Sequence, residues 1–311
     1  MNSKDFRIWD LVPNLWNKLR ERFIPREPTP PLPPAKSEST FQRLDTLSVA
    51  RLPIAETFDA NTDLEHPGGI ENGQTVYAIG DVHGRADLLE NLITAVRLDS
   101  SDGTSPATIV FLGDYIDRGF QSKQVIDLLC QLQQGSEFDT IFLKGNHEQA
   151  MLRFLDDPAI GPDWSAFGGR ETLISYGIIP PRNVQSIDQW RDAQQSLKQS
   201  IPTDHVDFLE SLPSHHQIGN FGFVHAGIRP GIPFAEQTDE DRLWIREVFL
   251  NASNREDLYI VHGHSPVDSP FVDHRRVNID TGAYFTGTLC ALKLTNSSMS
   301  FITNHSLDQR E

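Results

Sequence analysis

Cysteines and long apolar runs are scarce in this sequence. Its 311 residues include 2 cysteines, Cys130 and Cys290, which cannot form a disulfide framework. Each lies in an apolar run, so we expect buried free thiols and a reducing compartment. No run approaches the ~18 uninterrupted apolar residues of a membrane span. Asp5 and Asp10 interrupt the apolar N-terminus, which therefore lacks the core of a secretory signal, and the expected localisation is cytoplasmic.

Basic residues are also few in comparison with acidic ones. Lys and Arg number 27 against 43 Asp and Glu, which gives a formal net charge of −16. Nothing resembles a basic stripe that could neutralise phosphates, and this argues against a nucleic-acid partner. The 38% hydrophobic and 23% charged residues are typical of a globular protein. The length suits one large α/β domain with extensions.

Three strand–turn–helix units lie between residues 75 and 148. Apolar runs rich in β-branched and aromatic residues predict buried parallel strands, and each run ends in a small-residue turn that carries metal-type ligands. The predicted strands are 75–79, 108–112 and 140–144, and the turns are 80–84, 113–119 and 145–148. Apolar residues at helical spacing predict helices over 87–96 and 123–132. This order places all three turns at the carboxyl edge of one sheet, where open α/β sheets bind ligands.

The chain after residue 148 predicts a helical insert and then further strands. Helical spacing continues through 148–213, which we expect to form a wall beside the metal edge. Strands return at 221–227, 258–265, 276–282, 289–295 and 300–303, and the last three have the short connections of an antiparallel meander. The predicted fold is therefore an α/β layered sandwich of two mixed β-sheets flanked by helices.

The N-terminus differs in composition from the rest of the chain. Apolar residues spaced three and four apart predict an amphipathic segment at 1–24, and a stiff Pro-rich linker follows at 25–45. The catalytic domain would span 46–311, with 148–213 as its insert. The aromatic stripe among the basic residues of 6–23 suits docking to a membrane surface or to a partner, or packing against the catalytic domain itself.

Six side chains follow predicted strands in positions typical of metal ligands. They are Asp81, His83, Asp114, Asn146, His225 and His264. One such residue alone is more often a turn or hydrogen-bonding residue, but six of them after apolar strands indicate a metal site. Mixed carboxylate, amide and imidazole ligation suits Mn, Fe, Zn or Co. Two divalent ions, with Mn expected, could activate a water molecule and clamp a phosphate.

These motifs resemble those of a known family. GDVHG (80–84), GDYIDRG (113–119), GNHE (145–148) and the later VHAG and GHSP are similar to the signature of calcineurin-like metallophosphoesterases. More narrowly, they resemble the serine/threonine phosphoprotein phosphatase family and its bacterial and bacteriophage members. The motifs span residues 80–282, about two thirds of the chain, and the resemblance does not extend to residues 1–45.

The resemblance divides the six ligands between two metals. One ion would be held by Asp81 and His83 and the other by Asn146, His225 and His264, with Asp114 as the bridge. His262 lies in the same motif as His264; we expect His264 to be the ligand and His262 to support it, and a swapped register would reverse them. His215 and His216 are expected to be exposed loop residues, because no metal position remains for them.

The resemblance also implies which residues handle the substrate. His147 would be the general acid that protonates the departing oxygen, and Asp117 would orient its imidazolium and raise its pKa. Arg118 and Arg246, with Asn146, would bind the phosphate oxygens, and a surface salt bridge is the alternative for each arginine. The segments 168–177 and 279–287 would line the substrate cleft, although their glycines suit turns equally well.

The expected function is that of a metal-dependent phosphomonoesterase, a serine/threonine protein phosphatase acting on a phosphoprotein or phosphopeptide. The first alternative is symmetrical diadenosine tetraphosphate hydrolysis, against which Asp117 counts because those enzymes usually carry Asn at that position. The second alternative is a scaffold that acts through its N-terminal helix, although no ligand and no acid is missing from the motifs. The sequence leaves the physiological substrate, phosphotyrosine activity and the oligomeric state open.

Overall fold

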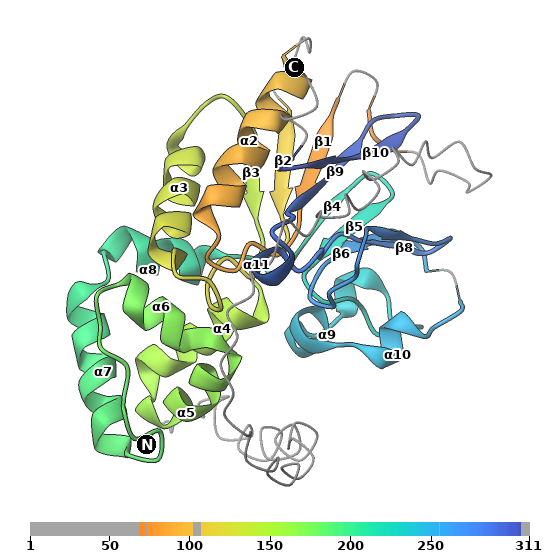
Figure 1. Cartoon of the computed structure of the whole chain (residues 1–311). Helices are drawn as coiled ribbons and strands as arrows, with labels where there is room; N and C mark the ends of the chain where they lie inside the picture. Colours follow the sequence, from red (N-terminus) through yellow and green to blue (C-terminus); the bar gives the residue numbers. More distant parts are fainter. Residues whose placement is uncertain (1–68, 72–73, 102–106, 255, 306–311) are drawn as a thin grey trace, which may run out of the picture. The chain divides into compact units, whose positions relative to one another are not determined.

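The computed structural model of the chain describes residues 69–71, 74–101, 107–254 and 256–305 (Figure 1). The expected N-terminal segment at 1–24, with its docking role, and the Pro-rich linker at 25–45 lie outside the described residues. Two mixed sheets with helices outside them confirm the predicted α/β sandwich. None of the described helices is long and apolar enough to cross a bilayer.

The first sheet combines the three predicted strand–turn units with a C-terminal hairpin. Its strands, in spatial order, are β10 (Met299–Thr303), β9 (Cys290–Leu294), β1 (Val76–Ile79), β2 (Thr108–Phe111) and β3 (Asp139–Phe142). β1 pairs with β2, and β2 with β3, in parallel. Their carboxyl ends therefore meet at one edge, as predicted. β9 runs antiparallel to β1, and β10 runs antiparallel to β9.

Alternate side chains of β1 point to two different apolar clusters, one on each face of the first sheet. Tyr77 and Ile79 pack in one cluster with buried residues of two helices, while Val76 and Ala78 pack in another cluster with the second sheet. The helices are α2 (Ala86–Ser100) and α3 (Ser122–Gln134). Successive side chains of a strand point to opposite faces, which causes this division. One face of the first sheet is thus covered by helices and the other by the second sheet.

The second sheet corrects two predictions. Its strands, in spatial order, are β4 (His215–Ile218), β5 (Phe221–Val224), β6 (Tyr259–His262), β8 (Arg276–Asn278) and β7 (Phe271–Val272). The predicted meander is wrong in its first strand, because β8 pairs in parallel with β6 whereas β9 and β10 belong to the other sheet. The expectation of an exposed loop for His215 and His216 is also wrong. Both are half-buried in β4, where they pair with Val224 and Phe223 of β5.

Short helices cover the outer face of the second sheet. They are η4 (Phe234–Glu236), α9 (Asp239–Trp244) and α10 (Glu247–Leu250). Phe249 of α10 packs in one cluster with Val224 and Ile260. The neighbouring strand residues Phe223 and Val261 belong instead to the apolar layer between the sheets. Each sheet therefore contributes one face to the common layer and turns the other toward helices.

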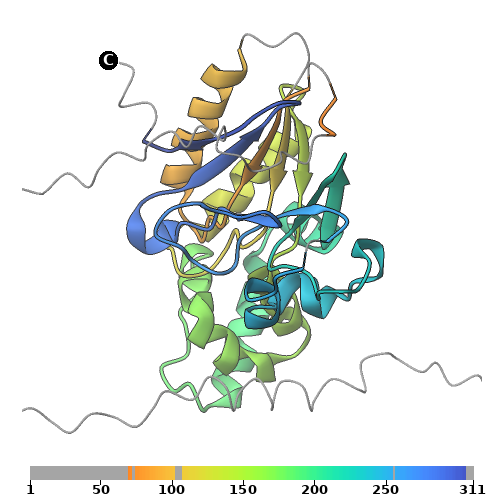
Figure 2. The same cartoon turned by 90° about the vertical axis from the view of Figure 1, so that its right-hand side faces the viewer.

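The chain from Asn146 to Ser211 forms a group of helices, green in both views, that lies below the strands (Figure 2). Its members are α4 (Asn146–Asp156), η2 (Pro158–Ile160), α5 (Gly161–Trp164), η3 (Ser165–Gly169), α6 (Arg170–Ser175), α7 (Ile187–Ser200) and α8 (Thr203–Ser211). Trp164 and Trp190 are buried here, and both rings contact Phe154. Because α4 begins at Asn146, the third metal-type turn leads directly into this group.

Replacing Gly113 by alanine should destabilise the chain more than the same change at Gly177. Both glycines have positive φ, 98° and 78°, so an alanine is strained by about 1–2 kcal/mol at either position. A Cβ at Gly113 would also lie 2.5 Å from the backbone nitrogen of Gly145, whereas nothing lies within 4 Å of one at Gly177. Urea unfolding of both variants measures the difference. Equal losses of unfolding free energy would show that the turns after β2 and β3 can separate at no cost.

Candidate active site

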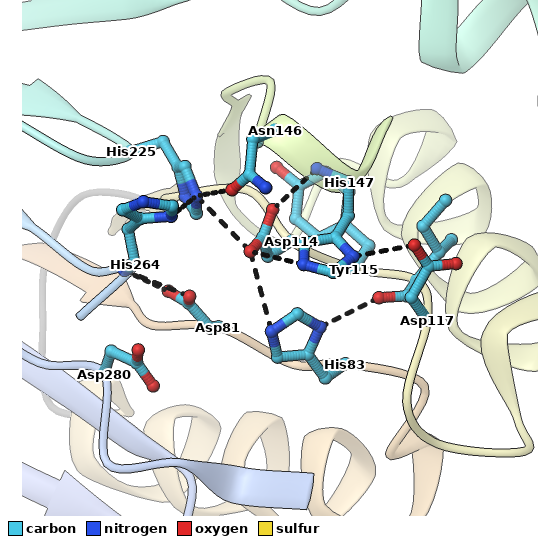
Figure 3. A network of polar contacts seen from close by, with 12 residues as sticks. Asp81, His83, Asp114, Tyr115, Asp117, Asn146, His147, His225, His264 and Asp280 are labelled. Carbon is cyan, nitrogen blue, oxygen red and sulfur yellow. Dashed lines mark hydrogen bonds and ion pairs between the residues drawn. The ribbon is translucent and has the colours of Figure 1, made fainter. Parts of the chain in front are cut away.

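The predicted site residues converge on the carboxyl ends of strands from both sheets. Asp81 follows β1, Asp114 follows β2, and Asn146 begins α4 after β3. From the second sheet, His225 follows β5 and His264 follows β6. Figure 3 shows the carboxylate of Asp114 at the centre of the group, with the histidines around it. All six predicted ligands are at most 5% exposed.

The backbone of this site is strained. In the described part of the chain, five residues other than glycine have positive φ, and all five are predicted site residues. They are His83 (47°), Asp114 (53°), Asp117 (71°), Arg118 (68°) and His264 (65°). Non-glycine residues adopt this left-handed conformation at a cost, and such strain is found where a structure positions functional side chains. The strain therefore singles out the same positions as the motifs.

Glu148 ties together the turns after β2 and β3. Its buried carboxylate accepts hydrogen bonds from the backbone N–H groups of Gly145 (2.7 Å), Asp114 (2.9 Å) and Tyr115 (2.8 Å). The bond to Gly145 is half of a capping box, since Glu148 is the third residue of α4. Glu148 was assigned no role of its own from the sequence, although it lies in the GNHE motif. A Glu three residues after a helix cap was the signal that could have revealed one.

Three atoms that can donate electron pairs surround Nε2 of His225, which can itself donate one. Its Nδ1 lies 3.0 Å from the carbonyl oxygen of Leu112, which can only accept, so Nδ1 carries the hydrogen. Its Nε2 lies 2.8 Å from Oδ1 of Asn146, 3.1 Å from Nδ1 of His264 and 3.3 Å from Oδ2 of Asp114. Facing lone pairs repel one another unless a cation or proton lies between them. This donor set therefore fits a divalent metal.

A second group of donors shares Asp114. His83 donates from Nδ1 to the carbonyl of Ile116 (2.9 Å), which leaves Nε2 facing Oδ2 of Asp114 at 3.5 Å. A histidine whose other ring nitrogen donates to a carbonyl is typical of metal ligation. The carboxylate of Asp81 lies nearby and accepts a hydrogen bond from the backbone N–H of His264 (3.0 Å) (Figure 3). Two groups of side chains that could hold a metal ion thus share Asp114, one with His225 and His264 and the other with His83 and His147.

The electrostatics of the cluster agree with a site for cations. Burial alone would lower the pKa of His225, but the charge and hydrogen bond of Asp114, together with the charges of Asp81 and Glu148, outweigh it and raise this pKa to about 9. Burial would raise the pKa of Asp114, yet the positive charges of His225 and His147 hold it well below its usual value. The site therefore retains positive charge next to Asp114, which bound divalent ions would also provide.

His147 and Asp117 form a buried pair beside this cluster. Nδ1 of His147 lies 2.7 Å from Oδ2 of Asp117, and Nε2 faces Oδ2 of Asp114 at 3.7 Å. Burial alone would lower the pKa of His147, but the charges of Asp114 and Asp117 outweigh it and raise the pKa. A protonated His147 would therefore present an N–H at Nε2 toward Asp114.

The two predicted phosphate-binding arginines lie at the rim of the cluster. The guanidinium of Arg118 stacks on the ring of Tyr284, 4.8 Å from its centroid, and Tyr284 belongs to α11 (Ala283–Thr286). Arg246 donates to Oγ of Ser265 at 3.4 Å. Burial lowers the pKa of Arg246, and the charge of Arg118 lowers it further against the opposing effect of Asp114. Both guanidinium charges act on the cluster, since burial and the charge of Arg118 lower the pKa of His83, and burial and the charge of Arg246 lower the pKa of His264.

The structure separates His262 from the cluster. Its Nδ1 donates to the carbonyl of Gly263 (3.0 Å), and its Nε2 accepts from the guanidinium of Arg276 (2.9 Å). Burial lowers its pKa to about 3, and the charge of Arg276 contributes to the shift. Both ring nitrogens are therefore used in supporting contacts. His264, the predicted ligand, is the residue that lies beside His225.

Two residues of the 279–287 segment were assigned no individual role from the sequence. Asp280 is buried next to Asp81, and burial raises its pKa to about 6 (Figure 3). Tyr284 stacks on Arg118 and meets the ring of His83 edge-on, with 5.5 Å between ring centroids. The resemblance of this segment to bacterial phosphatases was the available signal, but it did not distinguish these residues from turn residues.

A sequence profile of calcineurin-like phosphoesterases matches residues 74–291. The chain belongs to this family. Among its relatives, bis(5'-nucleosyl)-tetraphosphatase PrpE (asymmetrical) of Halalkalibacterium halodurans is 31% identical over 228 residues, which cover 69% of this chain and 88% of that protein. The protein of the same name from Anoxybacillus flavithermus is 28% identical over 241 residues, with the same coverage of both chains.

Solved structures share the fold at low sequence identity. One described as a candidate diadenosine tetraphosphatase has a TM-score of 0.51 and 20% identity, and the match covers 77% of this chain and 95% of that one. A cold-active protein tyrosine phosphatase has a TM-score of 0.50 and 16% identity, covering 76% and 80%. These comparisons confirm the metallophosphoesterase assignment, and with it a hydrolase that uses divalent metal ions. Neither of these two relatives is named as a phosphoprotein phosphatase, so the comparisons do not support that narrower assignment.

Mn²⁺ should stabilise the chain through Asp114. Binding to the folded state adds about 2.7 kcal/mol of stability when free metal exceeds its Kd by about 100-fold. The melting temperature of metal-stripped protein should therefore rise on adding Mn²⁺, and Asp114→Asn should lose most of this rise. Asp117→Asn is the matched control, because it makes the same change at a residue assigned to no metal. An undiminished rise in Asp114→Asn would contradict the bridging role.

Proposed function

We propose that the chain is a metal-dependent phosphomonoesterase that acts on phosphoserine and phosphothreonine in proteins. The observation that carries the proposal is the buried pair of His147 and Asp117 beside Asp114. The alkoxide that leaves a phosphoserine or phosphothreonine is strongly basic and must receive a proton. A phosphate that leaves an anhydride is a much weaker base. A preformed acid therefore supports an alkyl phosphate as substrate.

The side chains divide the work between binding and proton transfer. Arg118 and Arg246 would bind two phosphoryl oxygens through planar donors and orient the ester toward Asp114. His147 would then deliver the proton at Nε2 to the departing oxygen, while Asp117 keeps Nδ1 protonated and the ring in place. Divalent ions held around Asp114 would supply Lewis-acid activation of water and neutralise charge on the phosphate.

His147→Asn should lower kcat for a phosphothreonine peptide by about 100-fold, because the departing alkoxide then has no proton donor. The assay uses protein loaded with Mn²⁺, and the variant should bind the metal as the wild type does in a melting experiment. Hydrolysis of 2,4-dinitrophenyl phosphate, whose leaving group needs no proton, is the matched control and should fall only a few-fold. An unchanged kcat for the peptide would refute the acid role of His147.

A second candidate function is the asymmetrical hydrolysis of dinucleoside tetraphosphates. The named relatives favour it, although the alternative expected from the sequence was symmetrical cleavage. Two exposed aromatic side chains also favour it. Phe120 is two residues from Arg118 and Phe285 is next to Tyr284, and both are 62% exposed. Since Arg118 stacks on Tyr284, these rings adjoin the place where the arginines would hold phosphates, and a nucleobase could stack on them.

Removing both rings separates the two candidates. If dinucleoside tetraphosphates are substrates, Phe120→Ala with Phe285→Ala should raise KM for diadenosine tetraphosphate about tenfold or more. The KM for a phosphothreonine peptide should change little. Ile179→Ala, which removes an 82% exposed apolar side chain, is the control for the loss of surface hydrophobicity. Failure of the wild type to cleave diadenosine tetraphosphate would exclude this candidate.

A further inference from the structure

Asp117 is held by more hydrogen bonds than its role beside His147 requires. Oδ2 accepts from Nδ1 of His147 (2.7 Å) and also from Nε1 of Trp164 (2.9 Å). Oδ1 accepts from the hydroxyl of Thr172 (2.6 Å). The backbone N–H of Asp117 donates to Oγ1 of Thr172 (2.9 Å) and to Oγ of Ser122 (3.1 Å). Every one of these side chains is less than 3% exposed.

The donors fix which nitrogen of His147 carries a hydrogen. The single hydroxyl hydrogen of Thr172 points to Asp117, so Ser122 must donate in its 2.9 Å contact with Thr172. The indole N–H of Trp164 can only donate. With donors on both oxygens, the carboxylate of Asp117 acts as an acceptor, and Nδ1 of His147 is the donor to it. The remaining nitrogen, Nε2, is therefore the one that faces Asp114.

We propose that Thr172 and Trp164 are positioning residues that hold Asp117, and through it His147, in the geometry needed for proton donation. The inference rests on the proposed role of His147 as the acid and adds to it a requirement from the helical group. Asp117 has positive φ and sits in a turn, so its side chain needs outside contacts to keep one orientation. Trp164 of α5 supplies one such contact at the oxygen that also meets His147, and Thr172 of α6 supplies another at the second oxygen.

The helical group is itself built to present these two side chains. Trp164 is fully buried, with Phe154 4.8 Å away between ring centroids. A Cβ at Gly169 would lie 2.3 Å from the indole, so the chain packs directly on the ring. The adjacent Gly168, with φ of 104°, accepts a hydrogen bond from the backbone N–H of Arg118 (3.1 Å). The same turn therefore supports both the acid pair and a phosphate-binding arginine.

The test compares Thr172→Val with Thr172→Ser in full-length protein loaded with Mn²⁺. Valine keeps the shape of threonine and removes its hydroxyl, whereas serine keeps the hydroxyl and removes a methyl group. We expect Thr172→Val to lower kcat about tenfold for a phosphothreonine peptide and only about twofold for 2,4-dinitrophenyl phosphate. Thr172→Ser should restore the wild-type ratio of the two rates. Trp164→Phe, which removes the indole N–H, should act like Thr172→Val and provides a second variant if valine prevents folding.

His147→Asn, measured beside them, distinguishes the inference from the function on which it rests. Selective loss of peptide hydrolysis in His147→Asn, with wild-type rates in both Thr172→Val and Trp164→Phe, would overturn the positioning role and leave the acid in place. Equal losses for both substrates in Thr172→Val and Trp164→Phe would also overturn it, because they would indicate general damage to the fold. No selective loss in His147→Asn would overturn the proposed acid and the inference together.

Discussion

The carboxylate of Glu148 is the contact on which the site depends most. It accepts three strong backbone hydrogen bonds from two turns that are far apart in the chain. These bonds help to hold Asp114 at a φ of 53°, a left-handed conformation that costs free energy for residues other than glycine. Loss of the carboxylate would leave three buried N–H groups without partners, each at a cost of about 1–3 kcal/mol. The position of Asp114, which both groups of donors share, therefore depends on these bonds.

Local patterns were enough to predict the first sheet and the ligand turns. β1, β2 and β3 are short apolar runs followed by glycine turns, and their parallel pairing follows from the helices between them. The second sheet was less predictable because its pairing is not local. β8 has three residues, and nothing in its sequence shows that it pairs with β6 rather than with β9, the next strand in the chain. Likewise, His215 and His216 follow a proline and resemble a loop until β5 pairs with them.

The same distinction applies within the site. The motifs identified the residues that converge on Asp114 because each motif is a contiguous turn. The contacts of Asp117 with Trp164 and Thr172 join positions 47 and 55 residues apart, and no spacing rule connects them. These residues belong to a segment that was predicted from the sequence only to be a helical wall with glycines in turns. Its function as a support for the acid pair becomes visible only when the helices pack against the turn after β2.

The fold orients two of the predicted metal ligands through backbone carbonyls that belong to the first sheet and its turns. Leu112 ends the strand run before Asp114 and fixes His225 through Nδ1, although His225 comes from the second sheet. Ile116 fixes His83 in the same way. Because a backbone carbonyl fixes Nδ1 of each imidazole, Nε2 is the nitrogen that faces Asp114, without help from a metal. A site organised in this way gains affinity for divalent ions, because the side chains are already oriented in the folded chain and lose little conformational freedom when an ion binds.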